Sequence, residues 1–156
     1  MDKATALMRE YETIYVLNPA IADTSAKDFM IKMKDVVARQ GGKNIKVECL
    51  GRRKLAWERG KQNRGLYVLH TYLGQPGIVE EYERTLAIDD NVMLRQSVVR
   101  GIDVDPSIRV EEADRFDAPV VRERREHSRR DEFGQYDDSN FDFMSDDAGE
   151  EEKEEF

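Results

Sequence analysis

Apolar residues are concentrated in the first two thirds of this 156-residue chain, and this distribution limits which part of it can fold. Residues 1–100 hold 45 apolar side chains, whereas the last 56 residues hold 16. Only the first part can bury enough apolar surface to offset the entropy that a chain loses on folding. We therefore expect one small folded domain, followed by a segment without a core of its own.

The charge of the chain is divided at nearly the same place. Residues 1–100 carry 17 basic and 13 acidic side chains, whereas 101–156 carry 8 and 20, so the net charge of −8 comes from the C-terminal part. Repulsion between like charges opposes collapse. We expect 102–156 to be a charged, largely disordered tail and residues 1–7 to be a short N-terminal extension.

Between these ends, the spacing of apolar residues alternates between strand and helix patterns. Period-two alternation and β-branched residues indicate strands, and apolar residues three and four apart indicate helices. The order is a strand over 11–17, a helix over 23–40, strands over 45–57 and 66–73, a helix over 78–88 and a strand over 92–99. This order predicts an α+β domain over 8–101 with a ferredoxin-like split β-α-β topology: a four-stranded antiparallel sheet with both helices on one face.

Three local features refine this prediction. Asp23, Thr24 and Ser25 are suited to cap the start of the first helix, and Gly41 is suited to the left-handed conformation that ends one. Gly51 lies inside the second strand, where a glycine indicates a bulge. Residues 60–65 are expected to form the loop of a hairpin.

The sequence offers little for catalysis. His70 and His127 have no partner at the spacing of a catalytic triad or metal site, and the single Cys49 is expected to be a buried apolar residue. No phosphate-binding glycine loop is present either. We therefore expect no enzyme activity, no cofactor and no small-molecule substrate.

Nothing in the sequence indicates a membrane protein. The longest uninterrupted apolar runs have four residues, far below the roughly 20 that a bilayer requires. The first residues lack the apolar stretch of a secretory signal, which favours the cytoplasm.

The most unusual segment is 52–64, which has six basic residues and one acid. Basic side chains gathered on a strand and hairpin loop are what a phosphate-binding surface needs, although a solvated hairpin is the simpler alternative. The expected RNA-binding residues of this segment are Arg52, Arg53, Lys54, Lys61 and Arg64, to which Arg9, Arg95 and Arg100 would add. The base-stacking platform of RNA-recognition motifs is missing, because Leu66, Val68 and Thr71 stand where that motif has aromatic rings.

Three separated motifs carry a family resemblance. Residues 8–13 read Met-Arg-Glu-Tyr-Glu-Thr with Leu-Asn-Pro at 17–19, residues 50–57 read Leu-Gly-Arg-Arg-Lys-Leu-Ala-Trp, and Asp-Asn-Val at 90–92 precedes Val-Val-Arg at 98–100. In this order they resemble the bacterial small-subunit ribosomal protein six family over residues 8–101.

The resemblance implies a ferredoxin-like fold and a structural role without catalysis. Members of that family bind the central domain of small-subunit ribosomal RNA together with ribosomal protein eighteen, which places them on the cytoplasmic ribosome. The resemblance also implies that Arg95 and Arg100 are the leading RNA contacts, followed by Arg9, Arg52 and Arg53. Tyr11 and Trp57 would support the sheet.

A second hypothesis is a free ferredoxin-like regulatory or protein-interaction module that binds its partner through the open sheet. Sedimentation separates the two hypotheses, because only a ribosomal protein migrates with small subunits after a high-salt wash.

Overall fold

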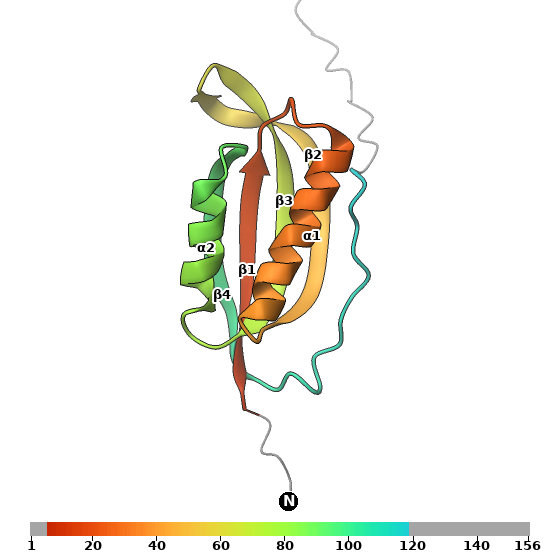
Figure 1. Ribbon diagram of the computed structural model, residues 1–156, viewed down its shortest axis with the longest axis vertical. Coiled ribbons are helices and arrows are strands. Elements are labelled where there is room, and N and C mark those ends of the chain that lie inside the picture. Colours follow the sequence, from red (N-terminus) through yellow and green to blue (C-terminus); the bar gives the residue numbers. More distant parts are fainter. Residues whose placement is uncertain (1–5, 119–156) are drawn as a thin grey trace, which may run out of the picture. The chain divides into compact units, whose positions relative to one another are not determined.

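The computed structural model describes residues 6–118, which form a four-stranded antiparallel sheet and two helices. The elements are β1 (Met8–Leu17), α1 (Asp23–Arg39), β2 (Lys43–Arg59), β3 (Gln62–Gly74), α2 (Ile78–Ile88) and β4 (Val92–Val104). The strand order is β2-β3-β1-β4, and each neighbouring pair is antiparallel. Both helices lie against the same face of the sheet (Figure 1). The predicted ferredoxin-like fold is confirmed.

The alternation of side chains along the strands places the core between this face and the helices. Tyr11, Thr13, Tyr15 and Leu17 of β1 point toward the helices and are at most 5% exposed. The remaining core residues come from the other strands and from one side of each helix; they include Met30, Met33, Val37, Val47, Val68, Tyr82 and Leu86. Residues at the intervening positions, such as Glu12 and Ile14, lie on the open face.

Helix α1 ends as predicted but begins differently. Gly41 has φ +73°, so a glycine takes the left-handed position after the helix. At the other end, the residue that precedes the helix is Ala22, and no side chain caps it. Asp23, expected to be a cap, instead accepts a hydrogen bond from Arg52 Nη2 at 2.9 Å.

A network of buried polar and aromatic side chains joins the sheet to α2. Tyr72 of β3 stacks on Tyr82 of α2 with ring centroids 4.9 Å apart. The hydroxyl of Tyr72 lies 3.0 Å from Thr13 Oγ1. Thr13 Oγ1 is in turn 2.8 Å from Ser97 Oγ on β4. Burial without these bonds would cost free energy, so the bonds select the observed packing.

His70 belongs to the same network. Its ring is fully buried, with Nε2 2.9 Å from Asn44 Oδ1 and Nδ1 2.7 Å from the Tyr82 hydroxyl. Asn44 donates its amide hydrogen to Lys34 O, so its Oδ1 accepts from Nε2 and the Tyr82 hydroxyl donates to Nδ1. Burial lowers the pKa of His70 to about 3. The imidazole is therefore neutral and forms part of the packed core.

The β2–β3 hairpin is longer than predicted. Gly60 and Lys61 form its turn with positive φ values of 52° and 65°, and β3 begins at Gln62, so the expected loop over 60–65 is mostly strand. The bulge expected at Gly51 is present: the register of β2 against β3 shifts between Cys49 and Gly51, and Gly51 has φ +87°.

After β4 the chain turns back and runs along the outer edge of β2 as a strap of residues 105–118 (Figure 1). The boundary predicted after Gly101 is therefore too early, because β4 continues to Val104 and the strap makes backbone hydrogen bonds to Ile45, Val47 and Cys49. Such bonds satisfy a bare sheet edge whatever the side chains are, so an acidic composition does not reveal them. The expected disorder of the later tail concerns residues outside those described, as do residues 1–5 of the N-terminal extension predicted over 1–7.

A titration of stability tests the role of His70. Because its pKa is near 3 in the folded protein and near 6.5 when exposed, the unfolded chain binds the extra proton between these values. Stability is therefore complete above about pH 6.5 and decreases by about 1.4 kcal/mol per pH unit as the pH falls toward 3. His70→Gln should remove this term, so urea unfolding of the two proteins should converge between pH 6.5 and 4.5. Parallel stability curves over this range would contradict the assignment.

Candidate nucleic-acid interface

The distal part of the β2–β3 hairpin, residues 52–64, projects beyond the rest of the sheet and is called the basic arm below (Figure 1). Strand β1 ends at Leu17, which lies opposite Leu66 of β3. Beyond that point β2 and β3 pair only with each other, as in Lys54 with Arg64. The arm therefore carries its charges on an extended ribbon that is largely exposed, with the exception of Leu55, which is 5% exposed.

The side chains of the arm differ in their surroundings. Lys54, Lys61 and Arg64 are exposed, and Arg53 is exposed while donating through Nε to Leu50 O at 3.2 Å. Trp57 is 69% exposed, so the support for the sheet that was predicted for it is wrong. The reason is its position on the ribbon, where no helix or third strand covers it.

Arg52 points back toward the body of the domain. Its Nε donates to Pro19 O at 3.0 Å, and its Nη2 donates to Ile21 O and Asp23 Oδ1, each at 2.9 Å. Pro19 and Ile21 belong to the loop between β1 and α1, and Asp23 is the first residue of α1. The geometry thus gives Arg52 a structural role in holding this loop, which sequence reasoning did not separate from the charge of the arm.

The tip of the arm meets the start of β4. Arg59 Nη1 donates to Met93 O at 3.3 Å. A cavity of about 390 Å³ lies between the two, lined by Asn18, Arg59, Gly60, Gln62, Asp90, Val92 and Met93. The arm and the first residues of β4 therefore form one continuous surface.

The structure separates the two arginines of β4. Arg95 is opposite Tyr15 in the ladder and so lies on the helix-facing side, whereas Arg100 pairs with Glu12 on the open face at 3.0 Å. Arg95 is near the arm end of β1. Arg100 is near the opposite end, because its neighbour Gly101 lies opposite Glu10.

The two N-terminal candidates also lie far from the arm. Arg9 is exposed and faces Gly74 in the ladder, at the end of β1 remote from Leu17. Tyr11 is 5% exposed and packs on Tyr72 with ring centroids 5.8 Å apart, in keeping with its predicted role within the sheet. The structure thus groups the arm with Arg95 and leaves Arg9 and Arg100 apart from them.

The open face of β3 offers little for base stacking. Leu66 and Val68, which the sequence comparison with RNA-recognition motifs placed on it, are instead buried beneath the helices. The open-face positions of β3 are Tyr67, Leu69 and Thr71, so this strand offers one half-buried aromatic ring. Recognition motifs that stack two or three bases need more than this.

The described residues show no arrangement typical of a catalytic centre. No group of three His, Cys, Asp or Glu side chains within residues 6–118 could hold a metal ion. Cys49 is buried, as expected. No helix in this part of the chain is long and apolar enough to cross a membrane.

The fold and the arm together define a ferredoxin-like protein with an exposed cationic ribbon. The family model described as Ribosomal protein S6 matches residues 10–100. The chain belongs to the ribosomal protein S6 family, which is part of the small ribosomal subunit.

Similar proteins support the same family assignment. Small ribosomal subunit protein bS6 of Citrifermentans bemidjiense is 40% identical over 92 residues, which cover 59% of this chain and 69% of that protein. The protein of the same name from Clostridium novyi is 40% identical over 86 residues, 55% of this chain and 90% of that one. The crystal structure of 30S ribosomal protein S6 from Thermotoga maritima has the same fold, with a TM-score of 0.57 and 24% identity over 60% of this chain and 88% of that chain.

The different surroundings of two adjacent arginines give a matched test. Arg52→Ala removes three hydrogen bonds from a side chain that is about one-third exposed, and should lower the free energy of unfolding by about 1 kcal/mol. Arg53→Ala removes the same charge and should change it by less than about 0.5 kcal/mol. Urea unfolding of both variants measures the difference. Equal losses would show that Arg52 does not hold the loop.

Proposed function

We propose that this protein is a structural component of the small ribosomal subunit in the cytoplasm and binds small-subunit ribosomal RNA through the basic arm and Arg95. The observation that carries the proposal is the arm itself. Its 13 residues have a net charge of +5, in a chain whose net charge is −8, and the fold places them on a ribbon that projects from the sheet. A ribbon of this kind can reach phosphates on both of its faces.

Contacts to phosphate and shape, rather than base edges, should dominate this binding. Lysine and arginine side chains that neutralise phosphates release counterions, and this release drives sequence-independent affinity. Trp57 adds one exposed ring that can stack on an unpaired base. The sheet is a poor platform for further stacking, because its open face carries mainly aliphatic side chains such as Ile14 and Leu69.

We also propose that binding occurs together with ribosomal protein eighteen, as the family resemblance implies. The open face supports a protein partner, since it combines half-buried apolar side chains with charged ones. Its apolar members include Ile14, Tyr67, Leu69, Leu94 and Val98, of which Val98 is 46% exposed. Surfaces of this composition are suited to a protein interface.

Replacement of Arg95 tests the RNA surface. Arg95→Ala should weaken binding of the full-length protein to the central domain of small-subunit ribosomal RNA by about 1 kcal/mol, and should make the salt dependence shallower by about one counterion. Filter binding at several salt concentrations measures both quantities.

Arg84→Ala is the matched control for this experiment. Arg84 is also exposed, but it lies on α2 and forms an ion pair with Glu81 at 2.8 Å. Its replacement removes the same charge and should leave RNA affinity almost unchanged. If both variants lose equal affinity, net charge alone explains the effect and Arg95 is not part of the site.

The partner proposal has its own measurement. RNA affinity should be at least tenfold higher in the presence of ribosomal protein eighteen than in its absence, because a domain of this size offers limited area to RNA by itself. By thermodynamic linkage, RNA should strengthen the protein–protein interaction by the same factor. Identical RNA affinities with and without the partner would contradict cooperative binding.

A further inference from the structure

The strap runs parallel to β2 along its outer edge and forms one isolated β-bridge with it, between Arg115 and Glu48. Glu112 N donates to Ile45 O at 2.7 Å, Arg115 N donates to Val47 O at 2.8 Å, and Cys49 N donates to Arg115 O at 2.7 Å. Side chains add further hydrogen bonds: Val47 N donates to Asp114 Oδ1 at 2.8 Å, and Lys43 Nζ donates to Pro106 O and Arg109 O, each at 2.8 Å. The outer edge of β2 is thus a working binding site for an extended chain.

Side chains beside this edge also contact the side chains of the strap. Asp114 pairs with Lys34 of α1, and Asp117 pairs with Lys27 at 3.7 Å. Between them, Phe116 packs against the core, with Lys27 Nζ 6.0 Å from its ring centroid. The site therefore accepts acidic residues beside an aromatic one, and the lysines of α1 provide the complementary charge.

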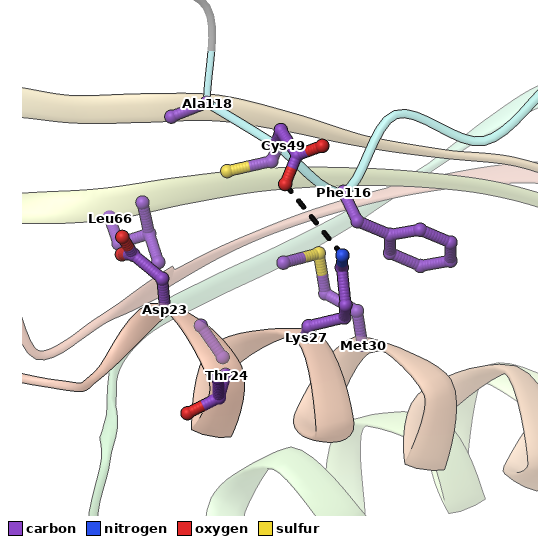
Figure 2. A pocket seen from close by; sticks show the side chains of 10 residues that line it. Asp23, Thr24, Lys27, Met30, Cys49, Leu66, Phe116 and Ala118 are labelled. Carbon is purple, nitrogen blue, oxygen red and sulfur yellow. Dashed lines mark ion pairs between the residues drawn. The ribbon is translucent and has the colours of Figure 1, made fainter.

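The strap fits this site incompletely. A cavity of about 330 Å³ remains between α1, β2 and the end of the strap (Figure 2). It is lined by Asp23, Thr24, Ala26, Lys27, Met30, Cys49, Leu66, Phe116, Asp117 and Ala118. The strap contributes Phe116, Asp117 and the small side chain of Ala118 to this lining and does not fill the cavity, while its apolar residues Ile108 and Val110 are 76% and 71% exposed.

These observations indicate that a segment with a larger apolar residue at this place would bind the edge of β2 more tightly than the strap does. We propose that the outer edge of β2 binds an extended segment of a partner protein, which displaces the strap and runs parallel to β2. The segment places an acidic residue against Lys34, an aromatic residue at the position of Phe116 and a large apolar residue in the cavity beside Ala118. This inference does not depend on the RNA-binding function proposed above.

A partner protein fits this site better than a second copy of the chain. A second copy would bring the same alanine to the cavity, and it would compete with a strap that is already tethered at high effective concentration. A segment with a large apolar residue at this place gains buried surface that the strap lacks.

The free energy gained by burying this apolar surface can offset the cost of detaching the strap. Its backbone bonds to β2 lie between Ile45 and Cys49, and several of its ion pairs are solvent-exposed, as for Asp117, whose side chain is 93% exposed. Segments with few buried apolar contacts open locally at a fraction of the cost of global unfolding.

Synthetic peptides provide the test with the full-length protein. The first peptide has the sequence of residues 105–118 with the last alanine replaced by phenylalanine. The second has the unaltered sequence. The third is the first peptide with Lys in place of the Asp at position 114. Binding is measured by fluorescence anisotropy of the labelled peptides. The first should bind at least tenfold more tightly than the second, and the third should not bind.

Two variants of the protein complete this experiment. Asp114→Lys places a lysine against Lys34 and weakens the strap, so the first peptide should bind this variant at least tenfold more tightly than it binds the wild type. Glu111→Lys makes the same charge change at an exposed strap residue and should leave peptide affinity unchanged. Circular dichroism shows whether both variants are folded.

Cys49 gives an independent measure, because it is the only cysteine and lies 2% exposed beside the strap. Ala118→Leu should fill the cavity from within the chain, slow the reaction of Cys49 with a maleimide several-fold and weaken binding of the first peptide. The proposal is overturned if the three peptides bind alike, if none binds the folded Asp114→Lys variant, or if Ala118→Leu changes neither the labelling rate nor peptide affinity.

Discussion

A connected set of buried and half-buried polar groups includes a member from every helix and strand of the domain. Its members are Lys34 through its carbonyl, then Asn44, His70, Tyr82, Tyr72, Thr13 and Ser97. Hydrogen bonds are directional, and an unpaired polar group in the core is costly, so each member restricts where its neighbours can lie. A shift of one residue in any strand would turn its member toward the open face. Apolar burial drives the chain together, and this network selects one arrangement of the six elements.

The elements themselves were predictable because each has one buried side. Period-two and period-3.6 patterns report which positions are apolar, and the order of these patterns is enough to specify a split β-α-β topology. The strap was missed because it is held by backbone groups and by charged side chains such as Asp114, which have no such periodicity. The predicted helix cap is absent: Asp23 accepts a hydrogen bond from Arg52 instead, and that contact depends on the folded position of the arm.

For the candidate interface, composition located the arm but not the role of each charge. An odd separation along a strand puts two residues on opposite faces, so the spacing of Arg95 and Arg100 already contained the signal that the structure makes explicit. Nothing comparable was available for Arg52, whose acceptors include the carbonyl groups of Pro19 and Ile21. The family resemblance implied that Trp57 supports the sheet, yet β1 ends before it can cover this side chain.

The strap has a mechanical consequence for the domain. Since it connects β4 at one edge of the sheet to β2 at the other, a force applied beyond residue 118 acts first on the contacts of Asp117 and Phe116 and then on the bonds between Arg115 and β2. These bonds break one after another from the C-terminal end, and the strap extends before any load reaches Val104. Pulling on the C-terminal side, whether by a protease or by a moving ribonucleoprotein, would therefore peel off a peripheral strand while the central strands stay paired.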